Sequence, residues 1–454
     1  MFKNLLKPFQ RAEGEPQPVA PRTAEAEALV KAGNAAEDAG RLEEAHRMYR
    51  QAVALAPQLP SAHLNLGIAQ EALGDAEAAR ASYQKVLALE PGHAFGAYNL
   101  GKLEYVGGRL RGAEALLRQS LAAKADFHDA WVLLSNVLDA LGDLPGAAQA
   151  IEQALRLKPD YAGALFNHAG ILRRLERIDD AEPSAARAAA LEPDNAEYLA
   201  SHSTILAMQG LCAEALVPLR RAMVLAPQRF DLRAKELFLL NHVEGISAQE
   251  IFRRHVELGR QLEQVVTERK HARPDAGKAR LRIGFVSGEL RSHPVALFLL
   301  PVLENLDRRR FEVACYDGGT RSDHVTERLR ALSDRWVDAR GWKDNQLDEA
   351  IAADAVDVLV DLDGYTSQVR VAMFAARPAP VQITWVGYLN TTGLTRMDYR
   401  LTDARCDPPA VAQPLHTESS CCCRRASGAT GRSSKWRPSP PRRASARDTS
   451  PSVR

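Results

Sequence analysis

The chain has 454 residues, enough to bury a large core and to divide into two or more domains. Its 59 Lys and Arg residues nearly cancel its 57 Asp and Glu residues, and the net charge of +2 gives no reason to expect nucleic acid or an anionic membrane as a partner. Hydrophobic residues make up 46% and aromatic residues only 6%, a bias typical of helices packed on helices.

The six cysteines indicate neither a disulfide framework nor a zinc site. Cys212, Cys315 and Cys406 stand alone, and the other three are adjacent at residues 421–423, so no spacing typical of either site occurs. Residues 1–10 hold only short apolar runs, and no apolar stretch approaches the length of a membrane span. We therefore expect a cytoplasmic protein with no metal site, no membrane partner and a disordered N-terminus at residues 1–22.

A repeat with a period of 34 residues occupies residues 23–240. Proline follows the second helix of each predicted hairpin, with Ala125 as the one replacement, and alanine recurs within that helix without a gap. The two columns are Pro57, Pro91, Pro159, Pro193 and Pro227, and Ala45, Ala79, Ala113, Ala147, Ala181 and Ala215. This period is that of a tetratricopeptide repeat. The sequence therefore predicts six hairpins stacked into an α-solenoid, a superhelix whose concave surface binds another polypeptide.

Asparagine recurs on the first helix of three repeats, at Asn65, Asn99 and Asn167. A side-chain amide both donates and accepts hydrogen bonds, so a row of amides can hold the backbone of an extended peptide whatever its side chains are. We predict that these three residues bind an acceptor peptide. The alternative is that asparagine simply suits this position of the repeat.

After residue 240 the repeat phase is lost, and residues 241–278 are predicted to be a helical linker. Short apolar strands then alternate with helices, which is the pattern of βαβ units in a parallel sheet with helices on both faces. The predicted strands are 281–287, 311–316, 356–362 and 381–385, and the predicted helices are 297–306, 325–332, 347–355 and a short one near Val371.

Ligands of such sheets bind beyond the carboxyl ends of the strands, so the residues directly after each strand are the candidates for a site. Glu289 and His293 share the loop after the first strand, and this pair suits general base catalysis on a hydroxyl group, although a solvated loop is the plainer interpretation. Residues 361–366 and 387–393 follow the third and fourth predicted strands, where backbone amides could hold a phosphate or a sugar. Neither a GxGxxG motif nor a P-loop lysine is present, which disfavours dinucleotide or ATP chemistry.

Several motifs in one order carry a family resemblance: the repeats, then LRIGFVS at 281–287, His293-Pro294, Gly364-Tyr365-Thr366, RPAPVQ at 377–382, WVGY at 385–388 and Met397-Asp398-Tyr399. Together they resemble the O-linked N-acetylglucosamine transferases of bacterial type. The resemblance implies transfer of N-acetylglucosamine from UDP-GlcNAc, a donor substrate, to Ser or Thr of acceptor proteins without a further cofactor. It also implies that residues 279–408 are the first, Rossmann-like half of a two-domain glycosyltransferase.

The resemblance also implies roles for individual residues. Glu289 and His293 match the acidic residue and histidine of the active-site loop, and His255 resembles a further active-site histidine of the family, so these three are the predicted catalytic residues. The loop after the fourth predicted strand contacts the donor sugar, which makes Gly387, Leu389 and Thr391 the predicted donor-binding residues. Two departures stand out: the acidic residue is usually Asp, and Leu389-Asn390 replaces the usual Pro-Gly.

Residues 409–454 are predicted to be a disordered tail. From about residue 415 the chain is rich in Ser, Arg, Ala and Pro, a composition that cannot bury a core. The abrupt change and the three adjacent cysteines favour a frameshift over the alternative, a natural basic tail that binds RNA. Nothing corresponds to the family's second domain, which holds most of the UDP-sugar, so we predict negligible transfer by this polypeptide. The alternative function is a non-catalytic tetratricopeptide module for protein binding. A homodimer is left open, because superhelical repeat surfaces often pair.

Overall fold

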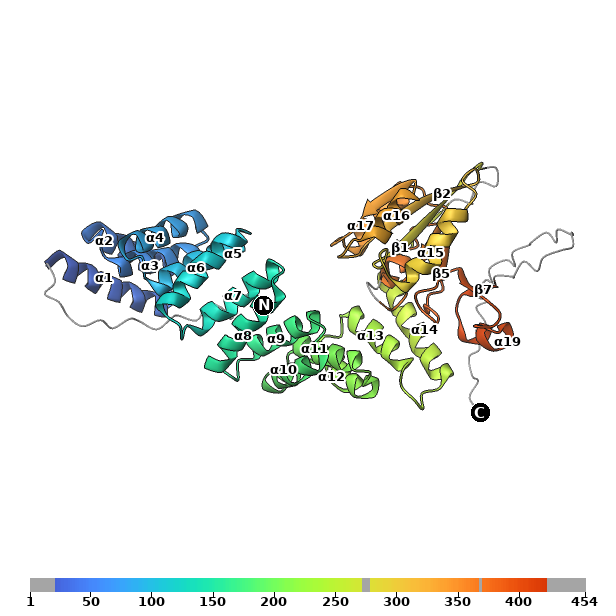
Figure 1. The fold of residues 1–454 in the computed structure, drawn as a ribbon, viewed down its shortest axis with the longest axis horizontal. Coiled ribbons are helices and arrows are strands. Elements are labelled where there is room, and N and C mark those ends of the chain that lie inside the picture. The colour runs from blue at the N-terminus through green and yellow to red at the C-terminus, as the bar shows by residue number, and fades with distance from the viewer. Residues whose placement is uncertain (1–20, 272–277, 367–369, 423–454) are drawn as a thin grey trace, which may run out of the picture. The chain divides into compact units, whose positions relative to one another are not determined.

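The computed structural model describes residues 21–271, 278–366 and 370–422 and divides into two compact units, Met1–Pro193 and Asp194–Arg454. The first unit contains five helix pairs that pack one on the next (Figure 1). They are α1 (Pro21–Asp38) with α2 (Leu42–Leu55), α3 (Pro60–Ala72) with α4 (Ala76–Leu89), α5 (Ala94–Val106) with α6 (Leu110–Ala123), α7 (His128–Ala140) with α8 (Leu144–Leu157), and α9 (Ala162–Arg174) with α10 (Ile178–Leu191). The predicted solenoid is confirmed.

The repeat columns explain how these helices approach one another. The column alanines of the second helices, from Ala45 to Ala181, are fully buried, because only a small side chain fits where the two helices of a hairpin cross. A Cβ on Gly33 or Gly67 would overlap the ring of Tyr49 or Tyr83, so these glycines make room for a buried tyrosine. The columns read from the sequence are therefore packing positions.

The second unit begins with helices of the same kind: α11 (Ala196–Met208), α12 (Cys212–Leu225) and α13 (Phe230–Leu240). The next helix, α14 (Ala248–Val265), falls in the predicted linker, but it is an integral part of this unit. It buries one face, formed by Ile251, His255, Leu258, Gly259 and Leu262. Helical periodicity alone indicates an amphipathic helix without indicating its partner, which is why the sequence suggested a connector.

A seven-stranded parallel sheet follows, with the order β3-β2-β1-β4-β5-β6-β7. The strands are β1 (Leu281–Ser287), β2 (Phe311–Asp317), β3 (Arg335–Asp338), β4 (Val358–Asp361), β5 (Val381–Trp385), β6 (Tyr399–Thr402) and β7 (Ser419–Cys422). The helices between them are α15 (Pro294–Asn305), α16 (His324–Ala331), α17 (Asp344–Ala353), α18 (Val371–Ala375) and α19 (Pro409–Ala412), followed by the 3₁₀ helix η1 (Gln413–Leu415).

The predicted parallel sheet is confirmed, and the core on one face includes Phe285, Leu299, Leu303, Val313 and Leu329. The chain leaves β1 toward β2 and β3, then returns to β4 on the other side of β1. The strand order therefore reverses between β1 and β4, the place beyond whose carboxyl ends open parallel sheets bind their ligands.

The prediction that the disordered tail begins at residue 409 is wrong for residues 409–422, which form α19, η1 and β7. The strand β7 pairs in parallel with β6, and Glu418, just before it, is fully buried. Composition indicated disorder because this stretch has few large apolar residues, whereas pairing with β6 and a buried carboxylate hold it in place. The rest of that predicted tail, and residues 1–20 of the predicted disordered N-terminus, lie outside the described residues. In the described ranges, no helix has both the length and the apolarity needed to cross a membrane.

Candidate functional site

Three loops meet at the carboxyl edge of the sheet, and Asp363 joins two of them. Its carboxylate accepts a hydrogen bond from Ser287 Oγ at 2.6 Å and one from the Gly288 amide at 2.7 Å. The loop after β1 is thereby tied to the loop after β4. Asp361 accepts from the amides of Asp363 and Gly364, at 3.1 Å each, and burial raises the pKa of Asp361 to about 6.

The loop after β1 places the predicted catalytic pair in one short segment, but the two side chains have different partners. A Glu289 carboxylate oxygen lies 2.6 Å from Nη2 of Arg291. His293 is the N-cap of α15, and its Nδ1 accepts a hydrogen bond from the Val295 amide at 3.3 Å. An Nδ1 that accepts leaves the proton of a neutral ring on Nε2, so in this arrangement Nε2 of His293 is a donor.

His293 lies at a pocket of about 240 Å³ between α15 and α16. The pocket is lined by Ser292, His293, Pro294, Ala296, Leu297, Leu300 and Val325. Most of these side chains are apolar, and the imidazole is the one titratable group among them. The pocket is open to solvent, because Leu297 in its lining is 74% exposed.

The loop after β5 is fixed tightly around a single exposed side chain. Gly387 packs so closely against the residues after β4 that a Cβ on Gly387 would overlap the Leu362 carbonyl oxygen. Thr391 is fully buried, and its hydroxyl donates to Glu418 at 2.7 Å. Leu389, in contrast, is 86% exposed. Of the three predicted donor-binding residues, Gly387 and Thr391 therefore shape the loop, and Leu389 is the one whose side chain is presented to solvent.

Two charged side chains, those of Glu418 and Arg400, hydrogen-bond to the backbone of the loop after β5. Glu418 accepts from the Thr392 amide at 2.6 Å as well as from Thr391. Arg400, which pairs with Asp407 at 2.8 Å, donates through Nη1 to the carbonyl oxygens of Tyr388 and Asn390. Both charged side chains are buried or nearly so, and such charges persist in a protein interior only when they are hydrogen-bonded in this way.

The helix α14 lies along the same loop through residues spaced four apart. His255 bonds Tyr388, Gly259 contacts Gly393 so closely that no Cβ fits, and Glu263 accepts from the Arg396 amide at 2.9 Å. Residues at this spacing lie on one face of a helix. The predicted linker is therefore part of the scaffold of the site.

His255 is completely buried, which is at odds with its predicted catalytic role. Its Nδ1 lies 2.7 Å from the Ile251 carbonyl oxygen and its Nε2 lies 2.7 Å from the Tyr388 hydroxyl. The rings of Tyr365 and Tyr388 pack against the imidazole with centroids 5.4 and 5.7 Å away. Burial lowers the pKa of His255 to about 4. A group that exchanges protons with a substrate must reach it, so the structure indicates a positioning role for His255.

The predicted peptide-binding asparagines are engaged between repeats. Asn65 Nδ2 donates to Asn34 Oδ1 at 3.1 Å, and Asn167 Nδ2 donates to Asn136 Oδ1 at 3.0 Å. Asn99 is buried, with 5% of its surface exposed, whereas Asn65 and Asn167 are half-buried. Each of these amides has a second N–H and a carbonyl oxygen, so an Asn–Asn contact between repeats leaves capacity for a bound chain.

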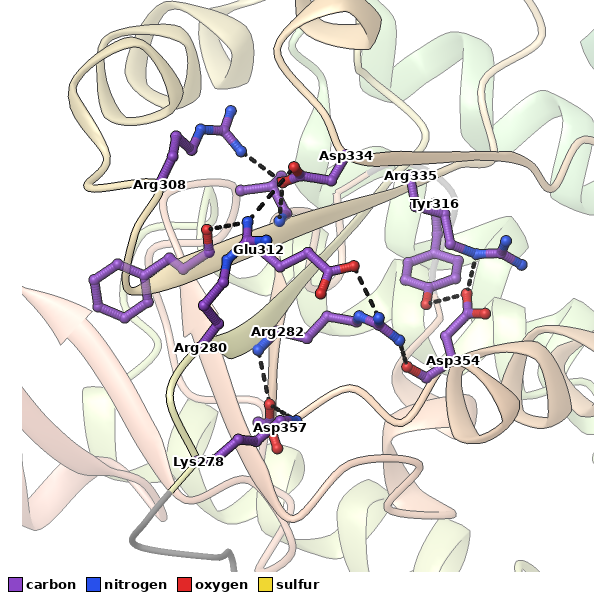
Figure 2. Close-up of polar contacts among 12 residues, drawn as sticks. Lys278, Arg280, Arg282, Arg308, Glu312, Tyr316, Asp334, Arg335, Asp354 and Asp357 are labelled. Atoms are coloured by element: carbon purple, nitrogen blue, oxygen red, sulfur yellow. Dashed lines mark hydrogen bonds and ion pairs between the residues drawn. The ribbon is translucent and has the colours of Figure 1, made fainter.

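A second polar cluster lies mainly at the amino ends of the strands, opposite the loops described above (Figure 2). Arg282 pairs with Glu312 at 2.8 Å, Arg308 pairs with Asp334 at 2.8 Å, and Lys278 pairs with Asp357. Tyr316 donates to Asp354 at 2.8 Å. Because opposite charges pair with one another here, the cluster is a structural network and offers no unpaired charge to a ligand.

No cluster of three or more His, Cys, Asp or Glu side chains suited to a metal ion occurs in the described part of the chain. Sequence reasoning missed Asn241, Arg400 and Glu418 as residues of the site. Their roles depend on contacts between segments far apart in the chain, which spacing along one sequence does not reveal.

Comparison with known proteins finds matches to both parts of the chain. Residues 236–420 match the model of glycosyl transferase family 41, and residues 30–94 and 98–162 match that of the tetratricopeptide repeat. A solved structure of an O-GlcNAc transferase mutant of Thermobaculum terrenum superposes with a TM-score of 0.59 at 34% identity, covering 65% of this chain and 57% of that one.

Two curated relatives match parts of the chain. A probable UDP-N-acetylglucosamine–peptide N-acetylglucosaminyltransferase SPINDLY of Oryza sativa subsp. japonica is 30% identical over 198 residues, which are 42% of this chain and 21% of that protein. The UDP-N-acetylglucosamine–peptide N-acetylglucosaminyltransferase of Caenorhabditis elegans is 38% identical over 138 residues, 29% of this chain and 12% of that protein. The chain thus spans about a fifth or less of the length of these relatives.

Proposed function

We propose that this chain, a tetratricopeptide-repeat protein whose residues 236–420 belong to glycosyl transferase family 41, acts in the transfer of N-acetylglucosamine from UDP-GlcNAc to Ser or Thr of acceptor proteins. The observation that carries the proposal is the convergence of the loops after β1, β4 and β5 at the point where the strand order reverses. Open parallel sheets bind their ligands at this point. The relatives' names supply the donor and the acceptor class.

In the proposed reaction the acceptor hydroxyl attacks the anomeric carbon, the bond from that carbon to the UDP oxygen breaks, and the hydroxyl proton passes to a base. We assign the base to Glu289, because a carboxylate can accept the proton directly. His293 presents Nε2–H in the neutral form described above, so we assign it hydrogen-bond donation to an anionic oxygen in the pocket. His255 acts through the loop after β5 and not on the substrate.

For the donor, we propose that the loop at residues 387–393 contacts the sugar through its backbone and Leu389. For the acceptor, we propose that the repeats bind an extended peptide, with Asn65, Asn99 and Asn167 contacting its backbone. These asparagines share one position of the second, third and fifth repeats, which suits a ligand with a regular backbone.

A transfer assay tests the catalytic part. Residues 236–420 replace the matching segment of the Thermobaculum terrenum enzyme, and we expect this chimera to transfer N-acetylglucosamine and its Glu289→Ala variant to lose at least about 100-fold in rate. A folded chimera that binds UDP-GlcNAc without any transfer would contradict the proposal. The non-catalytic module is the second candidate, and it is favoured if the intact chain binds peptides but the folded chimera binds no UDP-sugar. Negligible transfer by the intact chain stays a prediction, checked with radiolabelled UDP-GlcNAc.

A further inference from the structure

The side chain of Asn241, which directly follows α13, hydrogen-bonds through both its Nδ2 and its Oδ1, to its own helix and to the loop after β5. Its Nδ2 donates to the Leu237 carbonyl oxygen and to the Tyr388 hydroxyl, at 2.8 Å each. Its Oδ1 accepts from Asn390 Nδ2 at 2.9 Å. Two of these three partners belong to the loop after β5, which is 147 or more residues away in the sequence.

Asn241 is one link in a relay of five hydrogen bonds whose directions are all determined. The Ile251 carbonyl oxygen can only accept, so His255 carries its proton on Nδ1 and Nε2 accepts from Tyr388. The Tyr388 oxygen then accepts from Asn241, which in turn accepts from Asn390. Finally, Asn390 Oδ1 accepts from the Thr391 amide at 2.8 Å. The relay connects the backbone of α14 to the backbone of the loop.

The loop is held on its other side by Arg400, which donates to the carbonyl oxygens of Tyr388 and Asn390 at 3.1 and 2.9 Å. Residues 388 and 390 are thus fixed by both side chain and backbone, and Leu389 between them is 86% exposed. The loop after β5 therefore holds the exposed apolar side chain of Leu389 in one position.

We infer that Asn241 is a positioning residue that sets the conformation of residues 388–391, the donor loop of the proposed function on which this inference rests. In the family pattern described above, Pro-Gly occupies positions 389 and 390, and a proline ring stiffens the backbone by itself. Here Leu389-Asn390 stands in its place, and the Asn241–Asn390 pair supplies the constraint through side chains.

Hydrogen exchange of the intact chain tests the inference without any assay of activity. The exchange rate of the Thr391 amide reports directly on the last hydrogen bond of the relay, from this amide to Asn390 Oδ1. We expect Asn241→Ala to accelerate its exchange at least 10-fold. Asn241→Asp, nearly the same shape, still accepts from Asn390 but cannot donate to Tyr388, so its effect on exchange should lie between those of the wild type and Asn241→Ala. This graded response identifies hydrogen bonding as the cause, because a role in packing alone would leave the Asp variant unchanged.

Asn305→Ala is the matched control. Asn305 also ends a helix and also donates to a carbonyl four residues earlier, that of Pro301 at 2.8 Å, but this bond lies within its own helix and does not reach the loop. We expect wild-type exchange at Thr391 in this variant. If Asn241→Ala unfolds the second unit, Tyr388→Phe removes the hydroxyl that accepts from Asn241 but keeps the Asn390 acceptor of the Thr391 amide, and it should also accelerate exchange at Thr391.

Wild-type exchange at Thr391 in Asn241→Ala and in Tyr388→Phe would overturn the inference. Titration with UDP-GlcNAc in the chimera separates it from the proposed function. Faster exchange at Thr391 together with weaker binding of UDP-GlcNAc supports both the positioning role of Asn241 and the donor role of the loop. Faster exchange with unchanged binding supports the positioning role and contradicts the donor role of the loop.

Discussion

Gly259 of α14 and Gly393 of the loop after β5 lie so close that a Cβ on Gly259 would overlap the carbonyl oxygen of Gly393. Backbone therefore packs on backbone at this point, and neither segment can move away without losing the neighbouring contacts at His255 and Glu263. The helix that the sequence suggested to be a connector is thus the support of the candidate donor loop.

We expect Gly259→Ala to lower the free energy of unfolding of the second unit by about 2 kcal/mol or more, because the helix and the loop must separate to admit a methyl group. Urea unfolding, followed by exchange of the β1 and β4 amides, measures this. Gly170→Ala is the control: Gly170 is also helical, but a Cβ there meets nothing within 4 Å. Because Gly170 lies in the first unit, that variant should leave the unfolding of the second unit unchanged. Equal effects of the two changes would show that the glycine contact is unimportant.

His255 and Asp361 should contribute opposite pH dependences to stability. The pKa of His255 is lowered to about 4, so between pH 4 and 6.5 the unfolded chain binds a proton that the folded chain does not, and this contribution is lost as pH falls. The pKa of Asp361 is raised from 3.8 to about 6, so its contribution is present at low pH and is lost as pH rises through 6. Each is worth about 3 kcal/mol, so the two nearly cancel.

The substitution Asp361→Asn separates the pH-dependent contributions of His255 and Asp361. The side-chain oxygen of asparagine can still accept from the backbone amides of Asp363 and Gly364, but asparagine does not titrate. We expect the free energy of unfolding of this variant to rise by about 3 kcal/mol from pH 4 to 6.5, while the wild type changes much less. Urea titrations at several pH values provide the measurement. A flat profile in the variant would mean that His255 is not the buried neutral group described here.

His293 has two tasks that substitution can separate. As the N-cap of α15 it accepts from the Val295 amide, a task that asparagine also performs, whereas Nε2–H has no equivalent in asparagine. We expect the free energy of unfolding of His293→Asn to lie within about 0.5 kcal/mol of the wild-type value, and that of His293→Ala to be about 1 kcal/mol lower. In the chimera both variants should lose about 100-fold in transfer rate. Wild-type transfer by a stable His293→Asn variant would remove His293 from the reaction.

The asparagines between repeats should affect peptide binding more than folding. We expect Asn65→Ala and Asn167→Ala each to weaken binding of an acceptor peptide about fivefold, the loss of roughly one hydrogen bond. Fluorescence anisotropy with a labelled peptide measures this, and Asn305→Ala, which lies outside the repeats, is the control. Loss of stability with unchanged peptide affinity would instead support the interpretation that these amides only join neighbouring repeats.

The elements predicted well are those whose signal is local. The bounds of β1 and β5 are as predicted, because apolar residues alternate along both strands, at Leu281, Ile283 and Phe285 and at Val381, Ile383 and Trp385. The strand β3 reads Arg-Trp-Val-Asp, too short and too polar to indicate a strand. The strand β6 contains Arg400, whose pairing with Asp407 makes a charged residue acceptable in the interior. Hydrophobic pattern cannot anticipate such a pair.

The place of the site followed from the sheet rule, but its internal connections did not. The loops after β1 and β5 were predicted correctly as neighbours of one edge. Asn241 and Tyr388 are 147 residues apart and the sequence gives no sign that they touch. His255 shows the same limit: an imidazole on an amphipathic helix indicates chemistry or burial equally, and only the structure places it against the rings of Tyr365 and Tyr388.

Glu418 determines how much of the chain is needed to keep the donor loop in shape. Its carboxylate is fully buried and fastens Thr391 and Thr392 from a position 26 or 27 residues further along. A shortened version that stops before this glutamate would leave both threonines without their acceptor, even though every residue of the loop were present. One that stops just beyond β7 would retain it. For anyone trimming this protein for crystallisation or fusion, residue 418 therefore marks the earliest safe cutting point.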